Sequence, residues 1–138
     1  MPSGAPSSYT IHATQPRQRS PAEQTARRLG TSPIPALALA ATNAAALLVP
    51  SARRKLTGLP STMQCTMYSA IFAASAYALA SGDEVNGSGL AASWSTIWLF
   101  FNARRALKAR APLPIAIAAA TVSVGSLYAY NYATIGYD

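Results

Sequence analysis

The stretch that decides the fold runs from Asp83 to Arg110 and reads DEVNGSGLAASWSTIWLFFNARRALKAR. Two acids open it, 19 uncharged residues follow from Val85 to Ala103, and four cations close it. As a helix, the uncharged part would be about 29 Å long, which matches the hydrocarbon core of a bilayer. Acids at one end, cations at the other and apolar residues between them are typical of a helix that spans a membrane.

The composition of the whole chain agrees with a membrane location. Only 11% of the 138 residues are charged, less than half of the roughly 25% typical of soluble domains, while 51% are hydrophobic. A bilayer solvates such an apolar surface directly, and the length allows one domain. We therefore expect an integral membrane protein.

The net charge of +7 is distributed in a way that argues against nucleic acid as a partner. A nucleic-acid interface needs cations spread over one face and interleaved with aromatic side chains. Here the cations form three tight groups that long uncharged runs separate. Cys65 is the only cysteine, which excludes an intrachain disulfide and a cysteine-based metal site. We predict neither a metal nor a cofactor.

Four long apolar runs predict four helices, over residues 34–50, 60–81, 87–108 and 112–134. The expected fold is an all-α membrane protein, a four-helix transmembrane bundle of two antiparallel hairpins within a membrane domain over residues 33–138. Residues 1–32 contain four prolines and many serines and arginines, so we expect a disordered basic tail there. This tail is either a mitochondrial targeting segment or a plain exposed tail, and only residues 21–30 could form the amphipathic helix of a presequence.

The charges also predict how the helices cross the membrane. Four spans place the two later basic groups on one side and the adjacent acids Asp83 and Glu84 on the other. The positive-inside rule assigns the basic side to the matrix or cytoplasm. Arg27 and Arg28 then fall on the acidic side, against the rule, and a three-span chain in which residues 34–49 do not cross would remove this conflict. We favour four spans because that segment is uncharged, helix-prone and long enough to cross.

Small residues gather on one face of each predicted helix, most of them at four-residue spacing, a pattern that lets helices approach closely. The predicted helix-packing residues are Ala70, Ala74, Ala78, Gly82, Gly89, Ser93 and Thr96. These stripes are more extensive than one short bundle requires, so we expect a membrane-protein partner or self-association. The cations beside the helices are expected to contact anionic lipid head groups such as cardiolipin. They are Arg53, Arg54, Lys55, Arg104, Arg105, Lys108 and Arg110.

The sequence offers few groups for catalysis. No Asp, Glu, Lys, Arg or His lies inside the uncharged runs, which counts against a proton or ion pump. Asn43 and Asn131 could line a polar path, but hydrogen bonding between helices is the favoured interpretation. The two adjacent acids cannot face each other as an acid–base pair, so we interpret them as topology and helix-capping charges. Asn86 or Ser88 is expected to cap the helix that follows.

One block of the sequence resembles a known family. It runs from Glu84 to Ser95, EVNGSGLAASWS, and further pieces agree in order before and after it. These pieces are RL at 28–29, PIPAL at 33–37, STMQ at 61–64, LY at 127–128 and TIG at 134–136. Together they resemble the altered inheritance of mitochondria protein 19 family, small fungal proteins of the mitochondrial membrane. The likeness covers residues 27–138.

This resemblance implies a mitochondrial location and a multi-pass topology, and it brings no catalytic or ligand residues. We therefore predict a multi-pass protein of a mitochondrial membrane, the inner one, that is not an enzyme. It would support mitochondrial maintenance and inheritance as an accessory or assembly factor. The alternative is a small-solute carrier or pore whose path is lined by Ser, Thr and Asn on the helix faces. The expected partners are the bilayer with its anionic lipids, and a membrane protein or a second copy.

Overall fold

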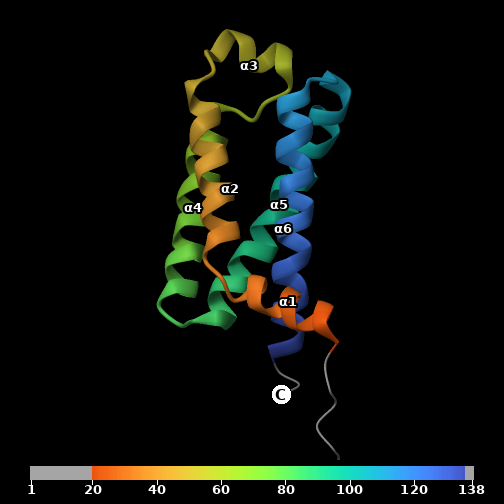
Figure 1. Cartoon of the computed structure of the whole chain (residues 1–138). Coiled ribbons are helices and arrows are strands. Elements are labelled where there is room, and N and C mark those ends of the chain that lie inside the picture. The colour runs from red at the N-terminus through yellow and green to blue at the C-terminus, as the bar shows by residue number, and fades with distance from the viewer. Residues whose placement is uncertain (1–19, 136–138) are drawn as a thin grey trace, which may run out of the picture.

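The computed structural model describes residues 20–135, apart from the side chains of Ser51 and Lys55, and that part contains helices and no strand. In chain order the elements are α1 (Pro21–Gly30), α2 (Ile34–Ala45), the 3₁₀ helix η1 (Ala46–Leu48), α3 (Ser51–Thr57), α4 (Thr62–Ala80), α5 (Glu84–Ala109) and α6 (Pro112–Thr134). Figure 1 shows α2, α4, α5 and α6 along the long axis, with α3 across one end and α1 across the other. The predicted all-α class is confirmed.

The four long helices pack as two antiparallel hairpins. α2 packs on α4, α4 on α5, and α5 on α6. Because successive long helices run in opposite directions, the α4–α5 turn lies at the same end as α1, and the α5–α6 turn lies at the same end as α3 (Figure 1). We call the first the acidic end and the second the basic end, after the charges that each one carries.

One helix, α6, is long and apolar enough by itself to cross a membrane. α1 and the segment Ile34–Leu48 are bent by 52° against each other and make a second candidate if the bent pair is one span. α4 is less apolar because it contains serine, threonine, tyrosine and glutamine, and α5 because it contains serine, glycine, asparagine and charged residues. The helices expected for a four-span bundle are therefore present, and one of them is a clear candidate for a span.

α1 lies in the segment that the sequence predicts to be disordered. That expectation, made for residues 1–32, does not hold over Pro21–Gly30, and residues 1–19 lie outside the described part. Ser20 and Glu23 form a capping box in which each side chain accepts a hydrogen bond from the other residue's backbone N–H. A proline at the first helical position also favours a helix start. This local cap outweighs the proline-rich composition.

The first predicted long helix, over residues 34–50, is shorter in the structure. α2 ends at Ala45 and η1 adds one tight turn, after which Val49 is extended. Val49 precedes Pro50, and a proline disfavours helical backbone at the residue before it. α3 follows Pro50 and contains Arg53, Arg54 and Lys55. These three cations therefore lie on a short helix across the end of the bundle and not in a loop.

The caps explain where the next helices begin. α4 begins at Thr62 because Ser61 forms a second capping box with Gln64. α5 begins at Glu84, three residues before the predicted start, because the Asp83 carboxylate accepts from the Asn86 backbone N–H at 3.1 Å. The cap is therefore Asp83 and not Asn86 or Ser88. α6 has the predicted bounds, residues 112–134.

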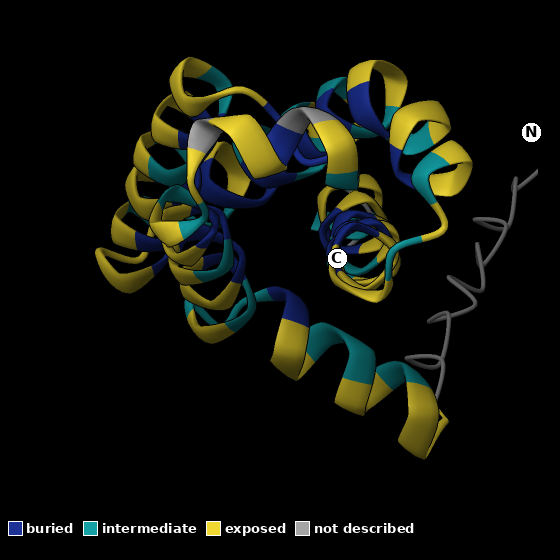
Figure 2. Ribbon diagram, turned by 90° about the horizontal axis from the view of Figure 1, so that it is seen from above, coloured by how far each residue is buried: buried dark blue, intermediate teal, exposed yellow. Residues whose placement is uncertain are grey.

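The core lies where the four long helices meet (Figure 2). Its largest buried side chains are Trp98, Tyr68, Tyr128, Phe72, Leu39 and Ile117. Trp98 is only 1% exposed and fills the centre of the bundle, whereas Phe100 and Phe101 on the same helix are exposed. The bundle axis is therefore occupied by aromatic and aliphatic side chains, and the outer surface keeps a large apolar share.

Candidate functional site

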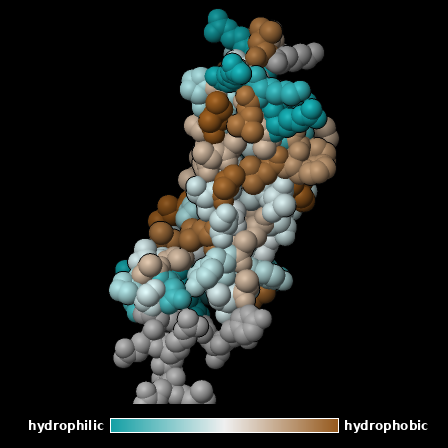
Figure 3. All heavy atoms as spheres, turned by 90° about the vertical axis from the view of Figure 1, so that its right-hand side faces the viewer, coloured by the Kyte–Doolittle hydropathy of each residue, from teal (hydrophilic) through white to brown (hydrophobic). Residues whose placement is uncertain are grey.

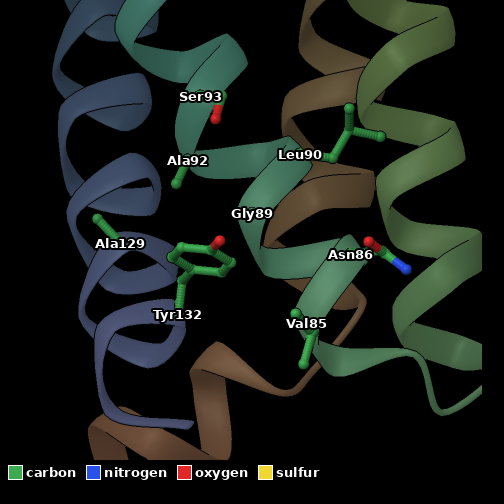
Figure 4. A pocket seen from close by; sticks show the side chains of 8 residues that line it. All are labelled: Val85, Asn86, Gly89, Leu90, Ala92, Ser93, Ala129 and Tyr132. Carbon is green, nitrogen blue, oxygen red and sulfur yellow. The ribbon is translucent and has the colours of Figure 1, made fainter. Parts of the chain in front are cut away.

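A groove runs along the outside of the α5–α6 hairpin and contains the small residues predicted on α5. Gly89 and Ser93 line a hollow of about 520 Å³ near the acidic end (Figure 4). Thr96 lines a second hollow of about 150 Å³ further along, and Ala129 of α6 borders both. We call the two together the α5–α6 groove. It is lined by Val85, Asn86, Gly89, Leu90, Ala92, Ser93, Ser95, Thr96, Leu99, Val122, Gly125, Ser126, Ala129 and Tyr132.

Small residues shape this groove because they let the two helices approach. A Cβ at Gly89 would lie 3.0 Å from the Tyr132 ring carbon Cε2, and a Cβ at Gly125 would lie 2.7 Å from the Cβ of Ser95. A side chain at Gly125 would push α5 and α6 apart, whereas at Gly89 the exposed ring of Tyr132 would have to shift. The predicted packing residue Gly89 therefore contacts a neighbouring helix, while Ser93 and Thr96 remain exposed beside it.

One polar side chain in the groove lacks a partner. Ser95 is 1% exposed, and its hydroxyl oxygen has no hydrogen bond within the described part. Thr96 satisfies its own hydroxyl on the Ala92 carbonyl one turn back at 3.0 Å. The sequence does not single out Ser95. Serine and alanine occur on every face of α5, so their positions do not predict which face is buried.

The other predicted stripe, on α4, lies outside the bundle. Ala70 and Ala74 are exposed, Ala78 is half-buried, and Gly82 lies past the helix end with no atom within 4 Å of where a Cβ would be. The contact face of α4 is instead lined by Cys65, Tyr68, Phe72, Ser75, Ala76 and Leu79. A role of the α4 stripe in packing therefore concerns another molecule, and it stays a prediction.

Buried amides join the helices as predicted. The Asn43 side-chain oxygen accepts from the Trp98 indole N–H at 3.3 Å, which links α2 to α5. The Asn131 side chain donates to the Gly30 carbonyl at 3.1 Å, which links α6 to α1. The favoured interpretation of both residues is thus confirmed. Asn102 is a third buried amide, and it donates to the Trp98 carbonyl at 3.1 Å.

The basic end brings together cations that are about 50 positions apart in the sequence. Gly58, just after α3, has a left-handed φ of 73°, and a Cβ there would lie 2.6 Å from the Ala109 Cβ and 2.9 Å from the Arg105 carbonyl oxygen. The end of α3 therefore abuts the last turns of α5. The exposed cations at this end are Arg53, Arg104, Arg105, Lys108 and Arg110, while the Lys55 side chain lies outside the described part.

Arg54 differs from its neighbours, because the fold uses its charge. It is 5% exposed and donates to the carbonyls of Leu47 at 2.6 Å and Val49 at 2.7 Å, and to the Thr62 hydroxyl at 3.0 Å. These carbonyls end η1, where a positive charge is favourable. The sequence groups Arg54 with the lipid-contacting cations, but its guanidinium group is enclosed and holds η1, α3 and α4 together.

The acidic end carries all the acids of the described part. Glu23 lies on α1, while Asp83 and Glu84 lie at the start of α5. The Asn86 side chain and backbone N–H both bond to the Asp83 carboxylate and lower its pKa below the usual range. Arg27 and Arg28 line a hollow of about 390 Å³ together with Glu84. The two arginines that conflict with the charge rule therefore lie beside an acid.

Comparison with known proteins identifies the family. The sequence profile described as altered inheritance of mitochondria protein 19 matches residues 29–133. The chain belongs to this family. A relative in Schizosaccharomyces pombe, named altered inheritance of mitochondria protein 19 homolog, is 35% identical over 91 residues, which cover 66% of the chain and 75% of the relative. No solved structure matches.

The altered inheritance of mitochondria protein 19 profile spans the whole bundle. It begins at Leu29, near the end of α1, and ends within the last turn of α6. Both the α5–α6 groove and the basic end lie inside the matched range. The family name connects the chain with mitochondria, in agreement with the resemblance seen in the sequence.

Proposed function

We propose that this protein is an integral protein of the mitochondrial inner membrane. In this proposal α2, α4, α5 and α6 each cross the bilayer, and the protein acts without catalysis as an accessory or assembly factor for a membrane complex. The basic end faces the matrix and the acidic end faces the intermembrane space. The family connects the chain with mitochondria, and the remaining steps rest on the distribution of charge and of small residues.

The observation that carries the membrane location is the charge-free belt between the two ends. Within residues 29–135, charged side chains occur only at 53–55, at 83–84 and at 104–110, where helices turn or end. The sides of the bundle between them expose large apolar side chains such as Leu37, Met67 and Phe100. Figure 3 shows the strongly hydrophilic side chains gathered toward the two ends on the α5–α6 side, with hydrophobic and near-neutral ones between them.

The α5–α6 groove supports the role of an accessory factor. Its small residues and free edges suit a transmembrane helix of another protein, since Gly, Ala, Ser and Thr permit close helix contact in membranes. The bundle axis, by contrast, is filled by Trp98, Tyr68 and Phe72, which favours packing over a solute path through one copy.

A matched pair of variants on α6 tests the groove. Ala129 and Ala120 are both exposed, but only Ala129 lines the groove, so Ala129→Leu fills it and Ala120→Leu adds the same bulk elsewhere. Native gels of mitochondria carrying a tagged chain should show an assembly larger than the monomer. Ala129→Leu should release the monomer and Ala120→Leu should not. A wild-type chain that migrates only as a monomer would contradict the proposal.

A further inference from the structure

We propose that the basic end binds the head groups of anionic phospholipids, with α3 lying in the head-group region and Leu48 and Leu56 reaching toward the acyl chains. This inference rests on the membrane insertion proposed above, but not on the accessory role. It assigns a ligand class to one surface of the protein and gives α3 a task beyond the packing role of Arg54.

The first step is that the fold unites two basic segments. Arg53 lies on α3, and the other exposed cations lie on the last turns of α5 or just beyond them. The contact of Gly58 with Ala109 and the Arg105 carbonyl joins the two segments directly. The positive charges therefore face one layer of head groups together, although the sequence separates them by about 50 residues.

The second step is that the exposed cations of the basic end have no carboxylate near them among the described residues. Among the described residues every carboxylate lies at the acidic end, so the exposed cations of the basic end have no acid within the fold to pair with. Arg54 is the contrasting case, since it is enclosed and bonded to two carbonyls and a hydroxyl. The surface thus carries net positive charge that only an external anion can neutralise.

The third step is that apolar side chains accompany the charge. Leu48, at the end of η1 just before α3, is 86% exposed, Leu56 on α3 is 83% exposed, and Leu107 is exposed among the cations of α5. A soluble anion would gain nothing from these leucines. A lipid surface offers both partners, because apolar side chains enter the acyl boundary while Arg and Lys reach the phosphates.

The position of the surface points the same way. The basic end lies directly beyond the charge-free belt, so in an inserted bundle its cations lie at the level of the head groups (Figure 3). Anionic lipids attract such cations within a Debye length of the surface. Charge complementarity and the flanking leucines therefore favour a phospholipid over a nucleic acid or a free phosphate.

The test uses the full chain in neutral detergent micelles, titrated with phosphatidylglycerol or with phosphatidylcholine, and follows thermal unfolding. Ligands that bind only the folded protein raise its melting temperature with concentration, which yields an apparent affinity. Phosphatidylglycerol should stabilise the protein well beyond phosphatidylcholine. The effect should weaken in 1 M salt and persist when inorganic phosphate replaces chloride at constant ionic strength. Equal effects of the two lipids, or loss of the effect in phosphate, would overturn the proposal.

Two pairs of adjacent arginines provide a matched control. Arg104→Gln/Arg105→Gln removes two charges from the basic end, and Arg27→Gln/Arg28→Gln removes two from α1 at the acidic end. The first variant should bind phosphatidylglycerol about 30-fold more weakly, at about fivefold per cation, and the second about as well as wild type. Arg104→Lys/Arg105→Lys should retain most of the binding, which excludes misfolding as the cause. Equal losses in both glutamine variants would refute the assignment.

The outcome is separable from that of the proposed function. Binding in micelles does not require a complex partner, so a monomeric chain that prefers phosphatidylglycerol would refute only the accessory role. A chain that forms a large assembly and binds both lipids alike would refute only this inference. Release of the chain from mitochondria by alkaline carbonate would refute the membrane insertion on which both depend.

Discussion

The Tyr128 hydroxyl caps α2 by accepting a hydrogen bond from the backbone N–H of Ala36 at 3.0 Å. The same hydroxyl donates to the Ser32 carbonyl at 2.7 Å. α2 needs this help, since its own N-cap residue, Pro33, makes no side-chain capping bond. A residue 92 positions away therefore satisfies the start of the first long helix and fixes α6 against the α1–α2 junction.

Tyr128→Phe should destabilise the fold by about 1–3 kcal/mol, because the buried N–H of Ala36 would lose its partner while the ring still fills its site. Thermal unfolding in detergent measures the change. Tyr77→Phe removes a hydroxyl from an exposed tyrosine on α4 and serves as the control, with an expected change near zero. If the two variants melt alike, the hydroxyl of Tyr128 does not cap α2.

The contact that unites the basic end can be tested with two glycines in left-handed backbone. Gly58 has φ 73° and touches α5, whereas Gly82 has φ 85° and faces open space. Gly82→Ala should cost only the left-handed backbone penalty, about 1–2 kcal/mol. Gly58→Ala should cost about 1–3 kcal/mol more, because its Cβ would overlap Ala109 and the Arg105 carbonyl. Equal losses in denaturant unfolding would show that the contact is absent.

The close approach of α5 and α6 predicts a compensating pair. Gly125→Ala alone should destabilise the protein by about 1–3 kcal/mol, because its Cβ would lie 2.7 Å from that of Ser95. Ser95→Gly removes the obstructing atom, so the double variant should recover part of the loss. A double-mutant cycle from unfolding data measures the coupling. Strictly additive losses would contradict this packing.

Asp83 should make stability depend on pH. Its carboxyl pKa is lowered in the folded state, first by the Asn86 side chain and then by the Asn86 backbone N–H. The stabilisation is therefore complete above the ordinary carboxyl pKa of about 4 and is lost as the pH falls through the lower folded value. Asp83→Asn keeps a capping side chain but removes this dependence. Between about pH 6 and pH 2 the free energy of unfolding should fall more steeply with decreasing pH in the wild type than in the variant.

Much of the architecture can be predicted from local features of the sequence, such as prolines, uncharged runs and clusters of charge. Pro112 and Pro114 ahead of a long uncharged run suffice to place α6, and alternating acidic and basic turns predict which ends of the helices meet. These features are local, or depend only on the order of charges along the chain. The structure agrees with them because a helix boundary needs only a cap, a proline or a cluster of charge.

The sequence could not predict features that depend on which side of a helix is buried. α5 carries alanine, serine or glycine around its whole circumference, so no periodicity marks Ser95 or Asn102 as buried and Ser93 as exposed. In the sequence nothing distinguishes Arg54 from Arg53 and Lys55. Its burial depends on the end of η1 and the start of α4, which enclose it only in the folded chain. The Tyr128 cap joins residues 92 apart, which no local pattern displays. The Ser20 capping box is local, but the prolines around it led to a prediction of disorder.

The most direct test of the account labels single cysteines from one side of the inner membrane. In a Cys65→Ser background, Ser81→Cys reports on the acidic end, Lys108→Cys on the basic end and Thr25→Cys on α1. Each is exposed in the wild-type fold. In mitochondria with a ruptured outer membrane, an impermeant maleimide should label positions 81 and 25 at once. It should reach position 108 only after detergent opens the inner membrane. Immediate labelling of all three would contradict a bundle that spans the membrane, and protection of position 25 together with 108 would show that α2 does not cross.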